Sequence, residues 1–354
     1  MAPISRRKFA TGGAALAAGA PASTLQSLDN APPEFAVEDQ TPFRGQTRRL
    51  KITDRGRFVT ALLFPTDYPT HFRLKPELHP VLTPKGLPVT DSHPYCFIHH
   101  QAIMCGHGRV RSEDGAVTDF YRKLPFPQED RADRWHSADR NLFHLGPSGI
   151  QRITGASWEG GERASIELTL AWETRERNAE DGIPILAEQR RYEISRRGPF
   201  TVVDHFSRLV PEKGTAVLEA DRHSFCGVRT HDLIDVEDGG RMFDSEGREN
   251  PDGNYWDAEG DRRAPRWVDC TGRIGDGVVG VTLMGHPDNE RNEVYVRHWG
   301  LMEVSATLGE DVSFSADRPF EFRARYAAHD GKLDVAATED LYAEFGRSPS
   351  PAEG

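Results

Sequence analysis

The sequence predicts an all-β protein, a large antiparallel β-sandwich with a short C-terminal helix. Three observations lead to this prediction. Many segments alternate apolar and polar residues with a period of two, turn sequences separate these segments, and the chain contains 33 glycines and 24 prolines. Short strands joined by turns rich in glycine and proline are typical of sandwiches and barrels.

The clearest strand lies at 166–173, where Ile166, Leu168, Leu170 and Trp172 alternate with more polar residues, as in a half-buried strand. The same pattern predicts strands at 57–64, 95–104, 188–194, 200–209, 278–284, 294–305 and 322–326. Residues 333–345 have the pattern of a C-terminal helix. The polar segment 237–266 interrupts the strand pattern, and we expect it to cross one rim of the sandwich.

The first residues have the features of a twin-arginine export signal. Arg6 and Arg7 precede a short apolar stretch, and Ala20-Pro21-Ala22 offers the small residues that a signal peptidase requires. We therefore expect a signal peptide over 1–22, a linker over 23–45, a single β-sandwich domain over 46–346 and a disordered tail over 347–354. The twin-arginine translocase would then export the chain, and we expect the mature protein to be periplasmic or secreted.

Composition excludes two classes of partner. The 354 residues carry a formal net charge of −11, and the predicted signal peptide, with Arg6, Arg7 and Lys8, contributes only positive charge. Such an acidic chain repels nucleic acid. Mean hydropathy is −0.60, and no window approaches the 18 or more apolar residues of a membrane span. We expect a small-molecule or oligosaccharide substrate.

Cysteine spacing excludes two further classes of site. Cys96, Cys105, Cys226 and Cys270 form no Cys-x-x-Cys pair, which argues against zinc ribbons and thioredoxin-like motifs. A bridge between Cys96 and Cys105 and four buried free thiols are both compatible with this spacing.

Histidines gather in one short stretch that contains His93, His99, His100 and His107. Imidazole suits acid–base catalysis and metal binding near neutral pH. As neighbours in a strand, His99 and His100 would point to opposite faces. Since His107 lies between two glycines, we expect it on a partly exposed loop next to a ligand, where its replacement by alanine would hardly change stability.

Three other segments carry candidate site residues. Glu188 shares a strand face with Arg190 and Tyr192, which suggests a cavity lining or a surface ion pair. Asp269 is a carboxylate within an otherwise apolar run, where burial requires a partner. Arg297 beside Trp299 pairs a fork of donors with a flat apolar ring, which suits a sugar or a carboxylate.

These motifs resemble those of the DUF6807 family, also labelled PmoA-like. His99-His100-Gln101 and Gly106-His107-Gly108 are similar to its HHR and GHG motifs, although Gln101 stands where the family has arginine. Segments 226–229, 267–272, 286–289 and 297–300 are similar to its GLGVR, WVDYSG, DHPxNP and VRxYG motifs. The resemblance covers residues 70–305 and implies a sandwich like that of galactose mutarotase, a fold found in carbohydrate-active proteins.

We therefore expect an extracytoplasmic enzyme, a hydrolase, lyase or epimerase, that acts on a sugar or sugar derivative. The expected catalytic residues are His99, His100, His107, Glu188 and Asp269. The expected substrate-binding residues are Arg191, Arg229, His286, Asn289, Arg297 and Trp299. We expect no cofactor.

Two alternatives remain. One is a carbohydrate-binding protein without catalysis that uses Trp256, Trp267 and Trp299 as stacking platforms. The other is a metal site built from His99, His107 and either His286 or Glu188.

Overall fold

The computed structural model describes residues 34–40, 48–65, 74–94, 97, 99–121, 148–175, 182–254 and 264–349. The predicted signal peptide at 1–22, residues 23–33 and 41–45 of the predicted linker and residues 350–354 of the predicted tail lie outside these ranges, as do Cys96 and Trp256.

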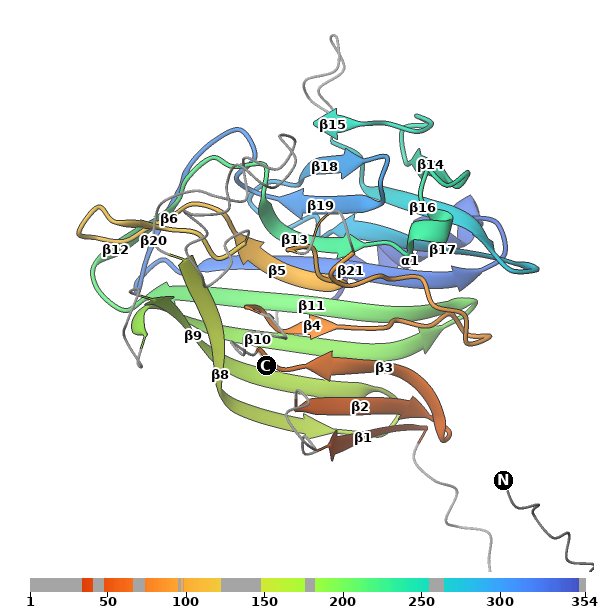
Figure 1. The fold of residues 1–354 in the computed structure, drawn as a ribbon, viewed down its shortest axis with the longest axis horizontal. Coiled ribbons are helices and arrows are strands. Elements are labelled where there is room, and N and C mark those ends of the chain that lie inside the picture. Colours follow the sequence, from red (N-terminus) through yellow and green to blue (C-terminus); the bar gives the residue numbers. More distant parts are fainter. Residues whose placement is uncertain are drawn as a thin grey trace, which may run out of the picture. The chain divides into compact units, whose positions relative to one another are not determined.

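Three antiparallel sheets make up the described part of the chain (Figure 1). The nine-stranded sheet has the order β1 (Phe35–Gln40), β2 (Arg49–Asp54), β3 (Arg57–Leu63), β4 (Glu77–Leu78), β5 (Ile103–His107), β13 (Ser224–Arg229), β19 (Leu301–Ser305), β18 (Glu293–Arg297) and β15 (Gly253–Asn254). The eight-stranded sheet has the order β14 (Arg241–Asp244), β16 (Trp267–Ile274), β17 (Gly277–Gly285), β21 (Phe320–Asp330), β11 (Phe200–Pro211), β10 (Ile183–Arg197), β9 (Ala164–Arg175) and β8 (Ser148–Glu159). A small sheet contains β20 (Val312–Ser315), β12 (Thr215–Leu218), β6 (Val110–Arg111) and β7 (Val117–Thr118). The predicted all-β fold is confirmed.

The hydrophobic core lies between the two large sheets. Ile103 and Val228 of the nine-stranded sheet belong to the same buried cluster as Trp172 and Tyr326 of the eight-stranded sheet. The predicted alternation at 166–173 is confirmed, because Ile166, Leu168, Leu170 and Trp172 are all at most 3% exposed. Period-two patterning thus determines which side of each strand faces the core.

Helix α1 (Val335–Phe345) covers the other face of the eight-stranded sheet. Its Leu341 and Phe345 pack with Phe200 and Trp267 of that sheet. Asp334 caps the helix by accepting a hydrogen bond from the N–H of Ala337, as is usual at a helix N-terminus. Within the described ranges, the structure contains no helix with the length and apolar character of a membrane span.

Three sequence-based boundaries are wrong. Residues 35–40 of the predicted linker form β1, because Phe35 is fully buried in the core and the strand pairs with β2. Within the segment 95–104 expected to be a strand, β5 begins only at Ile103, and the described His99 and His100 lie in a turn before it. The strand expected at 294–305 is a hairpin of β18 and β19.

The segment expected to cross a rim joins the two large sheets. Within 237–266, β14 pairs with β16 of the eight-stranded sheet, and β15 pairs with β18 of the nine-stranded sheet. Asp252, next to β15, accepts a hydrogen bond from the N–H of His298 at 3.1 Å. In the described part of this segment, polar groups thus bind the turn that follows β18, since His298 Nε2 also lies 2.8 Å from the carbonyl oxygen of Asn250.

An ion pair lies inside the sandwich between Glu188 and Arg190 of β10. Both side chains are fully buried, and their nearest charged atoms are 2.7 Å apart. Trp172 Nε1 and Ser207 Oγ also donate hydrogen bonds to Glu188. The face shared by Glu188, Arg190 and Tyr192 is therefore core and not solvent-exposed surface.

We predict that Arg190→Met lowers the free energy of unfolding by about 3–5 kcal/mol, because it leaves a buried carboxylate without its counter-charge. Urea denaturation measures the loss. Arg191→Met is the matched control: its side chain lies on the opposite face and pairs with Glu193 at 2.5 Å at the surface, and it should change stability by less than about 1 kcal/mol. Equal losses in the two variants would contradict this.

Candidate functional site

The outer face of the nine-stranded sheet, the face that points away from the core, carries a row of paired residues. Strand register places Glu77 opposite Met104, Met104 opposite Gly227, Gly227 opposite Glu303 and Glu303 opposite Tyr295. Directly paired residues in antiparallel strands share a face. Two buried carboxylates therefore share one face, with a methionine and a glycine between them.

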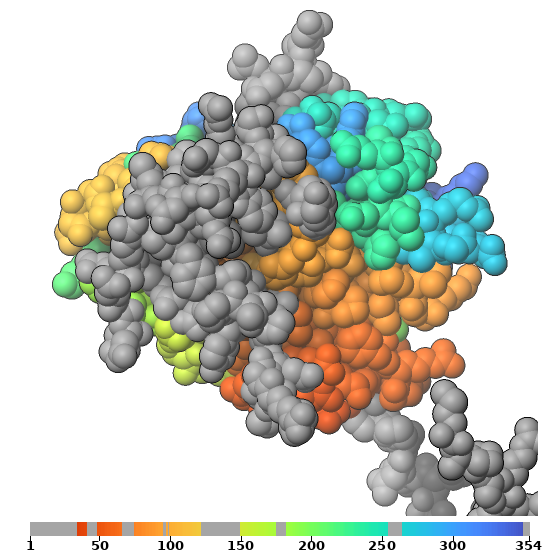
Figure 2. All heavy atoms as spheres, viewed as in Figure 1, coloured from red at the N-terminus to blue at the C-terminus, as the bar shows by residue number. Residues whose placement is uncertain are grey.

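A second row lies two residues further along the strands. Arg229 pairs with Leu301, which pairs with Arg297. Because side chains repeat their direction every second residue, both arginines project from the same outer face as Glu303. In the space-filling view, the orange surface around residues 74–100 adjoins the green surface around 230–250 (Figure 2).

Glu77 attaches the described part of segment 91–102 (91–94, 97 and 99–102) to this face. Ser92 Oγ donates to both carboxylate oxygens of Glu77, at 2.8 and 3.0 Å, and the N–H of Ala102 donates at 2.9 Å. The N–H of His93 donates to the carbonyl oxygen of His100 at 2.8 Å and closes the turn. A buried carboxylate thus stabilises the segment that carries the histidines.

Aromatic rings stack on the same side of the sheet. His100 stacks on Phe97 with ring centroids 4.9 Å apart, and Phe97 stacks on Trp299 at 5.0 Å. The guanidinium of Arg297 lies over the ring of Trp299 at 3.8 Å, a cation–π contact. His99 lies beside His100, with centroids 4.3 Å apart. The prediction that His99 and His100 point to opposite faces is wrong, because they occupy a turn and not a strand.

Burial strongly perturbs the Glu303 carboxyl of this face. It is 1% exposed, and burial raises its pKa well above the ordinary value despite a hydrogen bond from Tyr121. Tyr121 Oη donates to Oε1 at 2.5 Å, whereas Oε2 has no hydrogen-bond partner among the described residues. The side chain lies over Gly227, where a Cβ would come within 3.0 Å of Glu303 Cγ. Burial therefore favours the protonated form of Glu303, and its Oε2 is available to a ligand within the described structure.

Lys75 lies next to the same tyrosine. It is 1% exposed, its Nζ donates to the carbonyl oxygen of Tyr121 at 2.8 Å, and it lies 4.6 Å from the centroid of the Tyr121 ring. Burial lowers the pKa of Lys75 to about 8, although the charges of Asp119, Glu77 and Glu303 oppose the shift. Its stem lies over Gly106, where a Cβ would be 2.7 Å from Lys75 Cδ.

Arg229 and His100 add unpartnered atoms to this face. Arg229 is 1% exposed and pairs with Asp232 through Nη2, but its Nε and Nη1 have no hydrogen-bond partner in the described part of the chain. The same holds for Nδ1 of the buried His100. Burial lowers the pKa of His100 well below its ordinary value, and the charges of His99 and Arg229 lower it further. Unsatisfied buried polar atoms are rare and call for a ligand, ion or water.

We call Lys75, Glu77, His100, Tyr121, Arg229 and Glu303 the outer-face cluster. Of the predicted site residues, His100 and Arg229 belong to it, and His99, Arg297 and Trp299 adjoin it. Glu303 was not predicted as a site residue. It is nevertheless a carboxylate within an apolar strand, which is the same sequence signal that indicated Asp269. Lys75 has no comparable sequence signal.

The remaining predicted residues lie elsewhere. His107 is fully buried in β5, and its Nε2 is 2.9 Å from Thr307 Oγ1 while its Nδ1 accepts from the N–H of Arg109 at 3.0 Å. The loop prediction for His107 is therefore wrong. Glu188 lies inside the sandwich and Arg191 on the outer side of β10, so neither reaches the outer-face cluster.

Asp269, His286 and Asn289 lie on the side of the eight-stranded sheet that carries α1. Asp269 accepts hydrogen bonds from Thr282 and His329, both at 2.9 Å. His286 Nε2 lies 2.9 Å from the carbonyl oxygen of Phe345, and Asn289 binds the backbone of Arg323. These residues support the helix and its sheet, so they cannot share a substrate with His100.

The metal arrangement expected from sequence does not form. The structure does not bring together the candidate ligands His99, His107, His286 and Glu188. Each of them contacts a different set of neighbours. The described tryptophans that were expected to stack on a sugar already pack against protein groups. Trp267 is 1% exposed, and Trp299 packs against Phe97 and Arg297.

Comparisons with known proteins give one family match. Residues 49–343 match a model described as a family of unknown function, DUF6807. No curated protein matches the chain. A crystal structure of a TPR-domain containing protein from Parabacteroides distasonis aligns with a TM-score of 0.34 and 10% identity, over 82% of this chain and 48% of that chain. The chain thus spans about half of that protein, and a likeness this weak supports no conclusion about fold or function.

We predict that His107→Ala lowers the free energy of unfolding by about 2–4 kcal/mol, because it leaves a cavity and removes the buried partner of Thr307 and of the Arg109 N–H. His107→Gln, which keeps a donor and an acceptor, should lose less. Chemical denaturation of both variants checks this. An unchanged midpoint for His107→Ala would show that the imidazole has no structural role.

We also predict that His286 makes the fold acid-sensitive. Burial and the charge of Arg323 lower its pKa to about 4 from 6.5. Between these values the unfolded state binds more protons, so stability falls as the pH falls from 6.5 to 4. In His286→Gln, thermal midpoints across this range should depend less on pH than in the wild type. An identical pH dependence would exclude His286 as the cause.

Proposed function

We propose that this chain, which belongs to the DUF6807 family, is an extracytoplasmic enzyme that performs acid–base chemistry on a sugar or sugar derivative. The observation that carries the proposal is Glu303, a buried acid whose Oε2 has no partner in the described structure and which shares a sheet face with unpartnered donors of Arg229. The predicted export signal supports the location, which cell fractionation would test.

The cluster supplies an acid and a base. Burial shifts the pKa of Glu303 upward and that of His100 downward, which favours a protonated carboxyl at Glu303 and a neutral imidazole at His100. Groups whose environments separate their pKa values in this way are the usual acid and base of an enzyme site. Glu303 would protonate a substrate oxygen, while Nδ1 of His100 would take a proton from a substrate carbon or hydroxyl group, or from water.

Arg229 would hold the substrate. Its Nε and Nη1 are buried donors on different edges of the planar guanidinium, so together they can donate to two separate oxygens of the substrate. Sugars and sugar acids present such oxygen pairs. Tyr121 would orient Glu303 by binding its Oε1, and Lys75 would fix Tyr121 in turn.

This division of roles fits hydrolysis, elimination or epimerisation, because each moves one proton to the substrate system and one from it. In all three cases the proton balance is restored by exchange with solvent after product leaves. A binding protein without catalysis is less well supported, since the ring of Trp299 already packs against Phe97 and Arg297.

We predict that Glu303→Gln reduces turnover by at least about 100-fold, the usual contribution of a general acid. The assay incubates the full chain with neutral and acidic oligosaccharides and follows products by mass spectrometry. The wild-type rate should fall at alkaline pH as Glu303 loses its proton and at acid pH as His100 gains one. Glu193→Gln, at a partly exposed carboxylate of β10 that pairs with Arg191, is the matched control.

Two results would contradict this assignment. One is wild-type turnover by a folded Glu303→Gln variant. The other is an alkaline limb of the pH profile that survives in this variant.

A further inference from the structure

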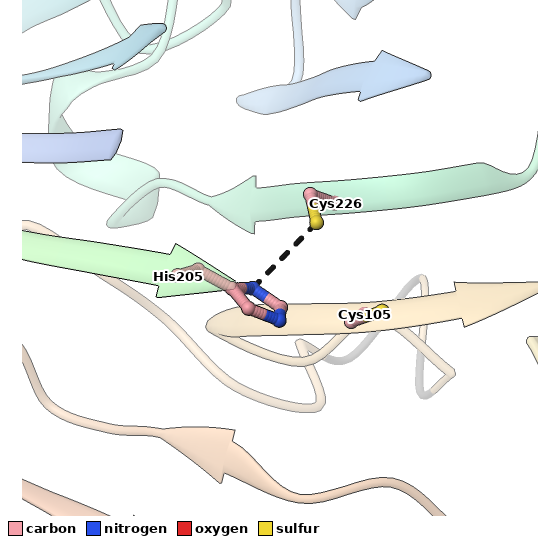
Figure 3. A group of neighbouring side chains, drawn as sticks. All are labelled: Cys105, His205 and Cys226. Atoms are coloured by element: carbon pink, nitrogen blue, oxygen red, sulfur yellow. Dashed lines mark hydrogen bonds between the residues drawn. The ribbon is translucent and has the colours of Figure 1, made fainter. Parts of the chain in front are cut away.

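A second cluster of reactive side chains lies inside the sandwich, behind the outer face. Cys105 of β5 and Cys226 of β13 are direct cross-strand partners, and His205 of β11 reaches them from the facing sheet (Figure 3). All three are at most 1% exposed, and one ligand atom from each lies within 4.8 Å of the other two. The two cysteines are free thiols.

The distances fit a tetrahedral metal ion. Zinc binds sulfur at about 2.3 Å and imidazole nitrogen at about 2.0 Å, so a nitrogen and a sulfur on one tetrahedral ion lie about 3.5 Å apart. His205 Nδ1 and Cys226 Sγ are 3.5 Å apart. The mutual separations of at most 4.8 Å leave room for an ion between the three ligand atoms after small side-chain shifts.

The surrounding polar groups lack partners. His205 Nε2 and the hydroxyls of Tyr192 and Tyr326 make no hydrogen bond of normal geometry to any described residue. The Tyr192 ring lies 4.8 Å from that of His205, and the Tyr326 hydroxyl neighbours Cys226. Burying these groups without partners is costly, and an ion bound by the two thiolates and by His205 Nδ1 would compensate for one of them by taking a tyrosine oxygen as its fourth ligand.

Charge balance favours a divalent ion. Glu188 and Arg190, which lie beside the cluster, neutralise each other. Two cysteine thiolates would neutralise an ion of charge +2, and His205 would bind as a neutral ligand. Thiolate and imidazole together favour zinc among common divalent ions.

We propose that Cys105, His205 and Cys226 bind one zinc ion that joins the two large sheets, with a fourth position open to a tyrosine hydroxyl or water. Binding replaces the two thiol protons, which are released to solvent, with two Zn–S bonds. The ion also fixes β5 and β13 at the residues next to Gly106 and Gly227, over which Lys75 and Glu303 lie. The presence of zinc here does not depend on the proposed catalytic activity.

Metal analysis and cobalt substitution of the full chain test the proposal. After saturation with zinc and removal of free metal, the wild type should retain roughly one equivalent. Replacing zinc by cobalt should produce sulfur-to-cobalt charge-transfer absorption in the near ultraviolet, which requires thiolate ligands. His205→Gln and Cys226→Ser should weaken zinc binding by more than about 100-fold.

Cys270→Ser is the matched control. Cys270 is also a buried free thiol, but it donates to the carbonyl oxygen of Ile234 and lies outside the cluster. This variant should keep full zinc content and the cobalt absorption. The cobalt spectrum of the wild type decides the question even if a ligand variant fails to fold.

Three results would overturn the proposal. They are less than about a tenth of an equivalent of retained zinc, cobalt binding without thiolate absorption, and a Cys105–Cys226 disulfide in zinc-treated protein purified under reducing conditions. The last would show that the paired thiols prefer oxidation to metal binding.

Discussion

The antiparallel register of β4, β5, β13, β19 and β18 determines which side chains meet on either side of the nine-stranded sheet. Hydrogen bonding between these strands places Glu77 and Glu303 in one row on the outer face. The same register turns Cys105 and Cys226 toward the interior. Since side chains alternate along a strand, a slip of one residue would exchange the two sets. The outer-face cluster and the proposed zinc site thus both result from the same pairing of strands.

Two glycines on these paired strands make the shifted pKa values of the outer face possible. Gly106 and Gly227 leave space for Lys75 and Glu303 to lie flat against the strands, and both residues are only 1% exposed. Desolvation then lowers the pKa of the lysine and raises that of the glutamate. These opposite shifts favour neutral forms of both groups, which are the forms that donate and accept protons in acid–base chemistry.

Sequence patterns predicted whether a residue is buried more reliably than they predicted where in the fold it lies. The alternation in 166–173 correctly indicated a strand with one buried face, and an isolated carboxylate in an apolar strand correctly indicated a buried Asp269 with partners. The same reasoning would have marked Glu303 as buried, but not as lying on the outer face with Arg229. His107 shows the converse error, because flanking glycines suggested a loop where the structure has a fully buried strand residue.

The sequence by itself determined the all-β class, the C-terminal helix and the alternation of most strands, because these depend on residues within one segment. Only the tertiary structure decided that Lys75, Arg229 and Glu303 share a face, that Asp269 lies on the side of the eight-stranded sheet that carries α1, and that His205 meets two cysteines of the facing sheet. These contacts depend on pairing and packing between strands that are far apart in the chain. A local period of two indicates that a residue is buried, but it carries no information about which distant residue is buried beside it.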